Sequence, residues 1–397
     1  MSATICLNMI VKNEGHIILE TLATLCQQVD FSYWVICDTG SSDDTKEKII
    51  QFFSERQLPG ALHERPWQNF AANRNEALRY CAGKADYVLI FDADDTIEGH
   101  LRLPQTLTAD YYRLQMKNDG GSTTYARPLL IKNQPGVRWR GVVHEFLDFP
   151  NGSQGTLLSG DYQIISRRLG ARSQEPDKYL KDALLLQAAI NRGEDPDLLP
   201  RYQFYCAQSY RDAERPKDAL KWYLRRAENP DGWAEERYIS RLEAGYHYDQ
   251  AKDSAQALYQ FQLGIAENPA RAEGWYQCAR IHSWAKRPHL AYIFAQEAVT
   301  KTLSTDFLFA NQRIYRYWSA YEHALNACRL GKFEESLPSL KQLVEQAPNH
   351  LLEAFHPYAK KLRPYFRQAP YTETQAFKNS CVQHGQVAFL QALNLDE

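Results

Sequence analysis

The sequence lacks any apolar run close to the roughly 18 residues that a membrane-spanning helix needs. Its apolar N-terminal stretch has no basic residues before it, and polar residues follow where a small-residue cleavage site would stand, so we expect a first strand and not a secretion signal. An excess of one charge is also missing, because the formal net charge is -2 over 397 residues. This excludes a global basic footprint for nucleic acid, although a local patch stays open.

Paired cysteine spacings are absent as well. The eight cysteines include no CxxC, and several lie within apolar or helical patterns. This excludes the usual zinc and disulfide frameworks and predicts buried, reduced thiols in a cytoplasmic protein. With 44% apolar and 24% charged residues the composition is globular, and the length predicts two domains.

The first part of the chain alternates strand and helix signals. Apolar runs of strand length occupy 4–11, 33–38, 62–67 and 86–95, and helical patterns over 16–28, 41–53 and 69–81 separate them. This order predicts a mostly parallel, doubly wound α/β sheet that binds ligands beyond the carboxyl ends of its strands. Shorter segments from about 109 onward predict antiparallel strands. We expect this sheet domain to span 1–170 and a helical linker to span 171–199.

The last part of the chain, from 200 to 397, is predicted to be an array of helical repeats. Gly245 and Ala279 lie 34 residues apart, and so do Ala257 and Ala291. This is the period of tetratricopeptide repeats, in which small residues let paired helices approach closely. Ala207 and Ala324 mark an earlier and a later unit of the same kind.

The motif Asp92-Ala93-Asp94-Asp95 follows the apolar run "YVLIF". Asp92 and Asp94 end this strand two residues apart, so they share one face and aim at one point beyond its carboxyl end. Two carboxylates at such a distance repel each other unless a cation lies between them. The motif therefore predicts a divalent metal and a phosphate-bearing ligand.

Four segments together carry a resemblance to a known family. "MIVKNE", "VICDTGSSDDT", "AANRNEAL" and "LIFDADD" occur in the order found in the family-2 inverting glycosyltransferases of the GT-A fold. The chain resembles them well over residues 3–100 and loosely over 100–165. With its repeats, the layout is similar to that of bacterial peptide S- and O-glycosyltransferases of this family.

The resemblance implies roles for individual residues on the donor side. Asp38 would accept a hydrogen bond from the nucleobase, Asp92 would face the ribose and the metal, and Asp94 would ligate Mg²⁺ or Mn²⁺ on a UDP-sugar. The remaining donor-site candidates are Lys12, Asn13, Glu14, Arg74 and either Arg167 or Arg168. Competing interpretations stay open: Asp38 and Asp43 also suit helix caps, and Arg74 also suits a surface ion pair.

The segment "RWRGVVHEFLD" supplies the acceptor-side candidates. Inverting transfer needs a general base, for which Glu145 is our first choice and Asp148 the second. His144 is a candidate third metal ligand. In a strand His144 and Glu145 would face opposite sides, so both can reach one site only if the chain bends there. Trp139 suits either sugar stacking or a domain interface.

These interpretations predict a metal-dependent inverting glycosyltransferase. Its acceptor would be a peptide or protein bound by the helical repeats, which form extended surfaces. Three alternatives remain: a saccharide or lipid-linked acceptor, modified nucleic acid, and a non-catalytic repeat scaffold.

Overall fold

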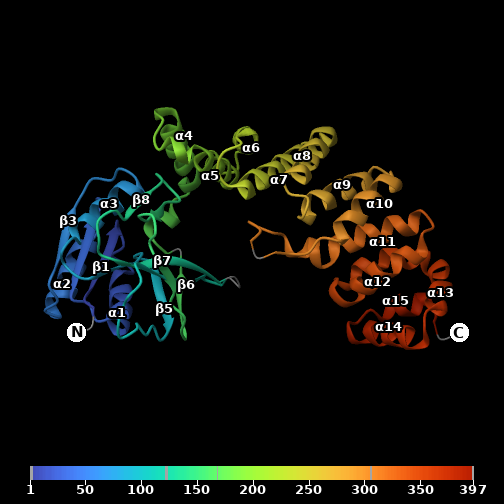
Figure 1. Ribbon diagram of the computed structural model, residues 1–397, viewed down its shortest axis with the longest axis horizontal. Coiled ribbons are helices and arrows are strands. Elements are labelled where there is room, and N and C mark those ends of the chain that lie inside the picture. Colours follow the sequence, from blue (N-terminus) through green and yellow to red (C-terminus); the bar gives the residue numbers. More distant parts are fainter. Residues whose placement is uncertain (1–2, 121–123, 168, 305, 396–397) are drawn as a thin grey trace. The chain divides into compact units, whose positions relative to one another are not determined.

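The computed structural model describes residues 3–120, 124–167, 169–304 and 306–395. They form two compact units, residues 1–198 and residues 199–397 (Figure 1). None of the helices described is long and apolar enough to cross a membrane.

The first unit is built on a mixed sheet with the strand order β3-β2-β1-β4-β7-β6-β11-β5, and β10 pairs with β6. β1, β2, β3 and β4 are parallel, whereas β7 is antiparallel to both β4 and β6. The strands are β1 (Ile5–Val11), β2 (Tyr33–Asp38), β3 (Gly60–Glu64), β4 (Tyr87–Ile90), β5 (Asp95–Gly99), β6 (Tyr111–Asn118), β7 (Thr124–Lys132), β10 (Gly155–Leu157) and β11 (Tyr162–Ser166). This is the α/β GT-A architecture that the family resemblance implied.

Helices cover both faces of this sheet because successive strand residues point to opposite sides. Leu7 and Met9 of β1 pack in one core with α1 (Ile18–Gln28) and α2 (Thr45–Glu55). Cys6, on the opposite face, packs in a second core with α3 (Phe70–Tyr80). The unit is completed by a small hairpin and three helical segments: β8 (Arg138–Arg140), β9 (Phe146–Asp148), η1 (Ala171–Gln174), α4 (Lys178–Arg192) and η2 (Pro196–Leu198).

Two expectations about the strands need correction. The third strand spans Gly60–Glu64 and not 62–67, because its register follows β2 from Trp34 to Asp38. The fourth strand ends at Ile90, and the acidic motif forms a turn into β5, which pairs antiparallel with β11. The motif therefore does not continue a strand, and the alternation argument does not apply to it.

The second unit consists of helices arranged as antiparallel hairpins. They are α5 (Leu199–Asp212), α6 (Pro216–Glu228), α7 (Ala234–Gln250), α8 (Ser254–Glu267), α9 (Ala272–Trp284), α10 (Pro288–Val299), η3 (Ile314–Trp318), α11 (Ser319–Arg329), α12 (Phe333–Gln346), η4 (Asn349–Tyr358), α13 (Ala359–Gln368), α14 (Tyr371–Gln383) and α15 (Val387–Leu393).

The small residues predicted from the repeat period lie where the helices of a hairpin pack. Ala207, Gly245, Ala279 and Ala324 are buried at equivalent places in α5, α7, α9 and α11. A Cβ atom at Gly245 would lie 2.4 Å from the ring of Phe261, so only glycine permits this approach of α7 and α8. The tetratricopeptide-like fold is thereby confirmed.

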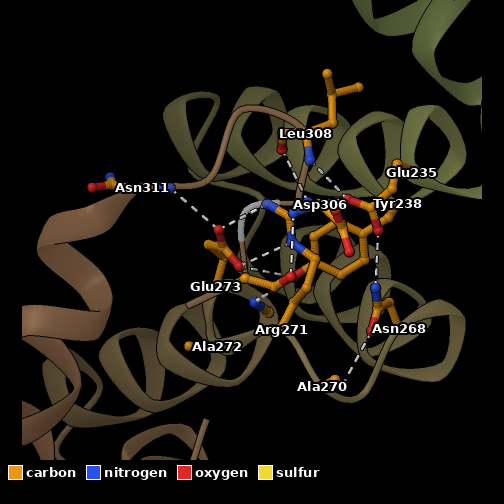
Figure 2. A network of polar contacts seen from close by, with 12 residues as sticks. Glu235, Tyr238, Asn268, Ala270, Arg271, Ala272, Glu273, Asp306, Leu308 and Asn311 are labelled. Atoms are coloured by element: carbon orange, nitrogen blue, oxygen red, sulfur yellow. Dashed lines mark hydrogen bonds and ion pairs between the residues drawn. The ribbon is translucent and has the colours of Figure 1, made fainter. Parts of the chain in front are cut away.

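A buried arginine ties the connection between α10 and α11 to the preceding hairpins. Arg271 is fully buried and contacts Glu235 at 2.6 Å and Glu273 at 2.8 Å (Figure 2). The same groups hold the backbone of the connection: Arg271 donates to the carbonyl of Leu308 at 3.0 Å, and Glu235 accepts from the amide of Leu308 at 2.9 Å. The amide of Asn311 donates to Glu273 at 3.3 Å.

Candidate active site

The polar segments singled out from the sequence meet at one edge of the sheet. β1 lies between β2 and β4, and all three run in the same direction. Lys12, Asn13 and Glu14 follow β1, Asp38 ends β2, and Asp92 comes shortly after β4. The edge beyond their carboxyl ends is where open α/β sheets bind ligands.

Asp38 is held so that one carboxylate oxygen remains free. Its Oδ2 accepts from the amides of Gly40 at 3.0 Å and Ser41 at 2.9 Å. Its Oδ1 is buried without a hydrogen-bond partner among the described residues. A buried acceptor left open in this way is suited to a ligand N–H.

The loops after β1 and β2 interlock through side chains. Asn13 adopts a φ of 57°, its amide donates to Ser41 at 2.8 Å, and its Oδ1 accepts from the amide of Ser42 at 2.8 Å. Asp43 accepts from the amide of Gly15 at 3.0 Å. Hydrogen bonds of Asn13 and Asp43 therefore hold the loop after β1 against the loop after β2.

A cavity of about 300 Å³ opens beside these loops. Lys12, Asn13, Glu14 and Thr39 line it from the ends of β1 and β2; Trp67, Phe70, Ala171, Arg172, Glu175 and Lys181 line it from elsewhere. The guanidinium of Arg172 lies 4.6 Å from the ring centre of Phe70. Sequence reasoning did not find the contribution of residues 171–181, because no motif marks them and only tertiary packing brings them to the edge.

Helix α3 anchors the hairpin that carries the acceptor-side candidates. Its Asn69 caps the helix by accepting from the amide of Ala72 at 2.8 Å. Asn75 exchanges two hydrogen bonds with the backbone of Trp139, at 2.7 and 2.8 Å. Trp139 is itself buried in the core beneath α3, so its ring packs and does not present an open face.

Arg74, one turn into α3, joins two of the predicted carboxylates. Its Nε donates to Glu145 at 2.9 Å and its second terminal nitrogen donates to Asp92 at 2.6 Å. The side chain is 8% exposed, and its guanidinium lies 5.0 Å from the Trp139 ring centre. Arg74 thus forms a buried bridge and not the surface ion pair considered from the sequence.

Asp92 and Asp94 point to different partners, contrary to the expectation of one common point. Asp92 contacts Arg74 and, at 4.0 Å, Arg127 of β7, which the sequence did not single out. Burial alone would raise the pKa of Asp92, yet these two cations hold it below its usual value. Asp94 instead accepts from the amide of Gly170 at 3.1 Å. The difference arises because the motif is a turn and not a strand.

Glu145 and His144 lie in the tight turn between β8 and β9. His144 has a φ of 53° and is exposed, whereas the Glu145 side chain is 11% exposed. The chain therefore bends at these residues, as it must if His144 and Glu145 are to reach one site. The structure nevertheless does not bring His144 together with Asp92 and Asp94. Within the described ranges, no three His, Cys, Asp or Glu side chains are grouped so as to hold a metal ion.

Asp148 and Arg167, two of the remaining candidates, form ion pairs and hydrogen bonds with other residues of the protein. Asp148 on β9 pairs with Arg138 at 3.2 Å and with Arg140 at 3.9 Å. Arg167 donates to the backbone carbonyl of Asp94 at 3.0 Å and to Glu20 at 2.6 Å, so it braces the acidic turn. Arg168 lies outside the described residues.

Buried carboxyl groups surround Asp94. Burial, and next the charge of Asp94, raise the pKa of Glu14 to about 7. Burial, followed by Asp92 and Asp94, raises the pKa of Asp95 to about 8. This donor set fits a hard divalent cation, which prefers carboxylate oxygens.

The mixed sheet, with carboxylates and a cavity at its strand ends, has the GT-A architecture. Residues 6–109 match the model of the family described as Glycosyl transferase family 2. The chain therefore carries a family 2 glycosyltransferase domain at its N-terminus and is a glycosyltransferase. A search of the curated proteins gives no match.

Several solved structures are similar to this chain at low identity. S. aureus TarS 1-349, in complex with UDP-GlcNAc, is 15% identical; the match covers 67% of this chain and 92% of that one, with a TM-score of 0.37. YrrB, "a TPR protein with an unusual peptide-binding site", is 17% identical, with 56% and 99% covered and a TM-score of 0.35. MamA is 14% identical, with 46% and 92% covered and a TM-score of 0.33.

Proposed function

We propose that this protein is a metal-dependent inverting glycosyltransferase that takes a sugar from a UDP-linked donor. The observation that carries the proposal is the bridge that Arg74, on the helix whose Phe70 lines the cavity, forms between Asp92 and Glu145. The bridge supports the proposal because one cation joins Asp92, which we assign to the donor side, to Glu145, which we assign to the acceptor side.

The donor would lie in the cavity lined by Lys12 and Asn13. The free Oδ1 of Asp38 accepts the nucleobase N–H, and Trp67 and Phe70 provide apolar surface for the ring. Lys12 and Arg172 supply positive charge for the diphosphate. A divalent cation held at Asp94 would neutralise charge that develops on the departing diphosphate.

Glu145 would serve as the general base. Arg74 binds its Oε1, which fixes the carboxylate and leaves Oε2 to accept the proton of the acceptor hydroxyl or thiol. The acceptor atom bonds to the anomeric carbon as the bond from that carbon to the diphosphate breaks, so the configuration inverts. Asp148 is less suited to this role because two arginines already pair with it.

The acceptor is proposed to be a peptide or protein that the helical unit binds. Helical repeats present extended surfaces suited to such ligands. Candidate peptides, oligosaccharides and single-stranded oligonucleotides would be incubated with the full chain, UDP-sugars and MnCl2, and the products weighed by mass spectrometry. Glycosylated peptide supports the proposal; modification of only the saccharide or the oligonucleotide would replace the acceptor class.

A panel of nucleotide sugars, scored for MnCl2-dependent hydrolysis, tests the donor. We expect UDP-sugars to be hydrolysed by the wild type and hydrolysis to be lost in Asp94→Asn. If Asp94→Asn hydrolyses UDP-sugars as fast as the wild type, the assignment of the metal is wrong. Absence of both hydrolysis and stabilisation by UDP with MnCl2 would favour the scaffold alternative.

A further inference from the structure

The turn after β11 brings two carboxylates from distant parts of the chain together. The amide of Gly170 donates to Oδ2 of Asp94 at 3.1 Å, and the amide of Ala171 donates to Oε1 of Glu14 at 3.4 Å. A Cβ atom at Gly170 would lie 3.2 Å from each of these two oxygens. Both oxygens therefore border one small space, which a glycine leaves open.

The Glu14 carboxylate also has an unused oxygen. The residue is 9% exposed, and its Oε2 is buried without a hydrogen-bond partner among the described residues. A buried acceptor without a partner costs about 1–3 kcal/mol, more when the group is charged, and calls for a ligand to explain it. The neighbouring carboxylate of Asp94 adds to this cost, because its negative charge repels an ionised Glu14.

The previously named candidates leave the position of second metal ligand open. Asp92 is engaged by Arg74 and lies near Arg127, and His144 is exposed in the β8–β9 turn. Mg²⁺ in nucleotide sites takes one or two carboxylates, with phosphate oxygens and waters completing its shell. Two protein carboxylates beside the nucleotide cavity satisfy this requirement.

We propose that Glu14 is the second carboxylate, beside Asp94, that holds the divalent cation accompanying the donor diphosphate. The proposal rests on the function proposed above, because the cation arrives with the donor. It assigns Gly170 a role as well: its missing side chain keeps the space between the two carboxylates clear, and its amide orients Asp94.

The test is calorimetric titration of UDP into the full chain, in MnCl2 and in EDTA. For the wild type we expect tighter binding in MnCl2, and the ratio of the two dissociation constants measures the contribution of the metal. Glu14→Gln should reduce this ratio by roughly tenfold or more, the scale seen when metal-site residues are altered. Binding in EDTA should be unchanged or tighter, since one negative charge is removed.

Matched variants make the outcomes distinct. Glu47→Gln removes an exposed carboxylate of the same unit and should keep the wild-type ratio. Gly170→Ala leaves both carboxylates in place but fills the space, and should lower the ratio even if Glu14→Gln does not fold.

Different results would refute the metal dependence of UDP binding and the role of Glu14. If the wild type binds UDP equally in MnCl2 and EDTA, the proposed metal dependence fails. If the wild type shows the metal effect and folded Glu14→Gln or Gly170→Ala retains it in full, the metal dependence stands and the role of Glu14 is wrong.

Discussion

Replacing Arg74 by methionine tests the connection between the two halves of the proposed active site. The side chain is 8% exposed and donates to Glu145 at 2.9 Å and to Asp92 at 2.6 Å. Hydrogen bonds to charged groups contribute about 1.5–3 kcal/mol each. If about 3 kcal/mol of this total is expressed in the transition state, kcat/KM falls by roughly 150-fold.

Methionine keeps most of the packing against Trp139 but leaves both carboxylates without their shared cation. Arg74→Lys keeps the charge but cannot hold two partners in the same fork geometry, so we expect an intermediate loss. Steady-state transfer with UDP-sugar gives kcat/KM, and urea unfolding of each variant separates activity from stability. Arg79→Met, at an exposed position of the same helix, should leave kcat/KM unchanged.

The cost of Arg74→Met in two backgrounds shows whether Arg74 acts through Glu145. Because Arg74 acts partly by fixing Glu145, its replacement should cost less in a Glu145→Gln background than in the wild type. Equal costs in both backgrounds, or an Arg74→Met enzyme within about threefold of the wild type, would show that the bridge does not position the base.

Three further predictions concern the helical unit. Arg271→Met removes the buried cation that pairs with Glu235 and with the buried Glu273, and should lower the free energy of unfolding by about 3–5 kcal/mol in urea titrations. Gly245→Ala should cost about 1–3 kcal/mol, whereas Gly264→Ala, whose Cβ would meet nothing nearer than 3.6 Å, should be neutral or stabilising. Burial lowers the pKa of His323 below 6.5, so its stabilisation is complete above that pH and is lost as the pH falls through the lower native value; His323→Gln should lose less stability between pH 7 and pH 5.

Periodicity and strand ends made most of the fold predictable. The 34-residue spacing identified the buried small residues of the helical hairpins, and the alternation of strands and helices placed Asp38 and Asp92 at one edge. Both features are local properties of the sequence. Each depends on a repeat of two, 3.6 or 34 residues that can be counted along the chain.

The contacts between residues of the candidate site could not be predicted from the sequence. Asp92 and Asp94 have different partners because the chain turns over residues 91–94. The apolar run before the motif favoured a continuous strand, so the sequence did not indicate this turn. The approach of Glu14 to Asp94 depends on Gly170, more than 70 residues after the motif, and nothing in the residues between them marks the contact. Such pairs arise from tertiary packing, for which a single sequence carries no periodic signal.

The network around Arg271 changes how the helical unit is expected to unfold. Repeat arrays usually behave as a row of neighbours, each stabilised by the next, and they fray from their ends. Here the α10–α11 connection binds Glu235 and Arg271 through Leu308, and the ring of Phe309 lies parallel to Phe204 of α5 at 6.4 Å. Contacts that span three hairpins couple their opening. The first hairpins should therefore lose their structure together, in one cooperative step.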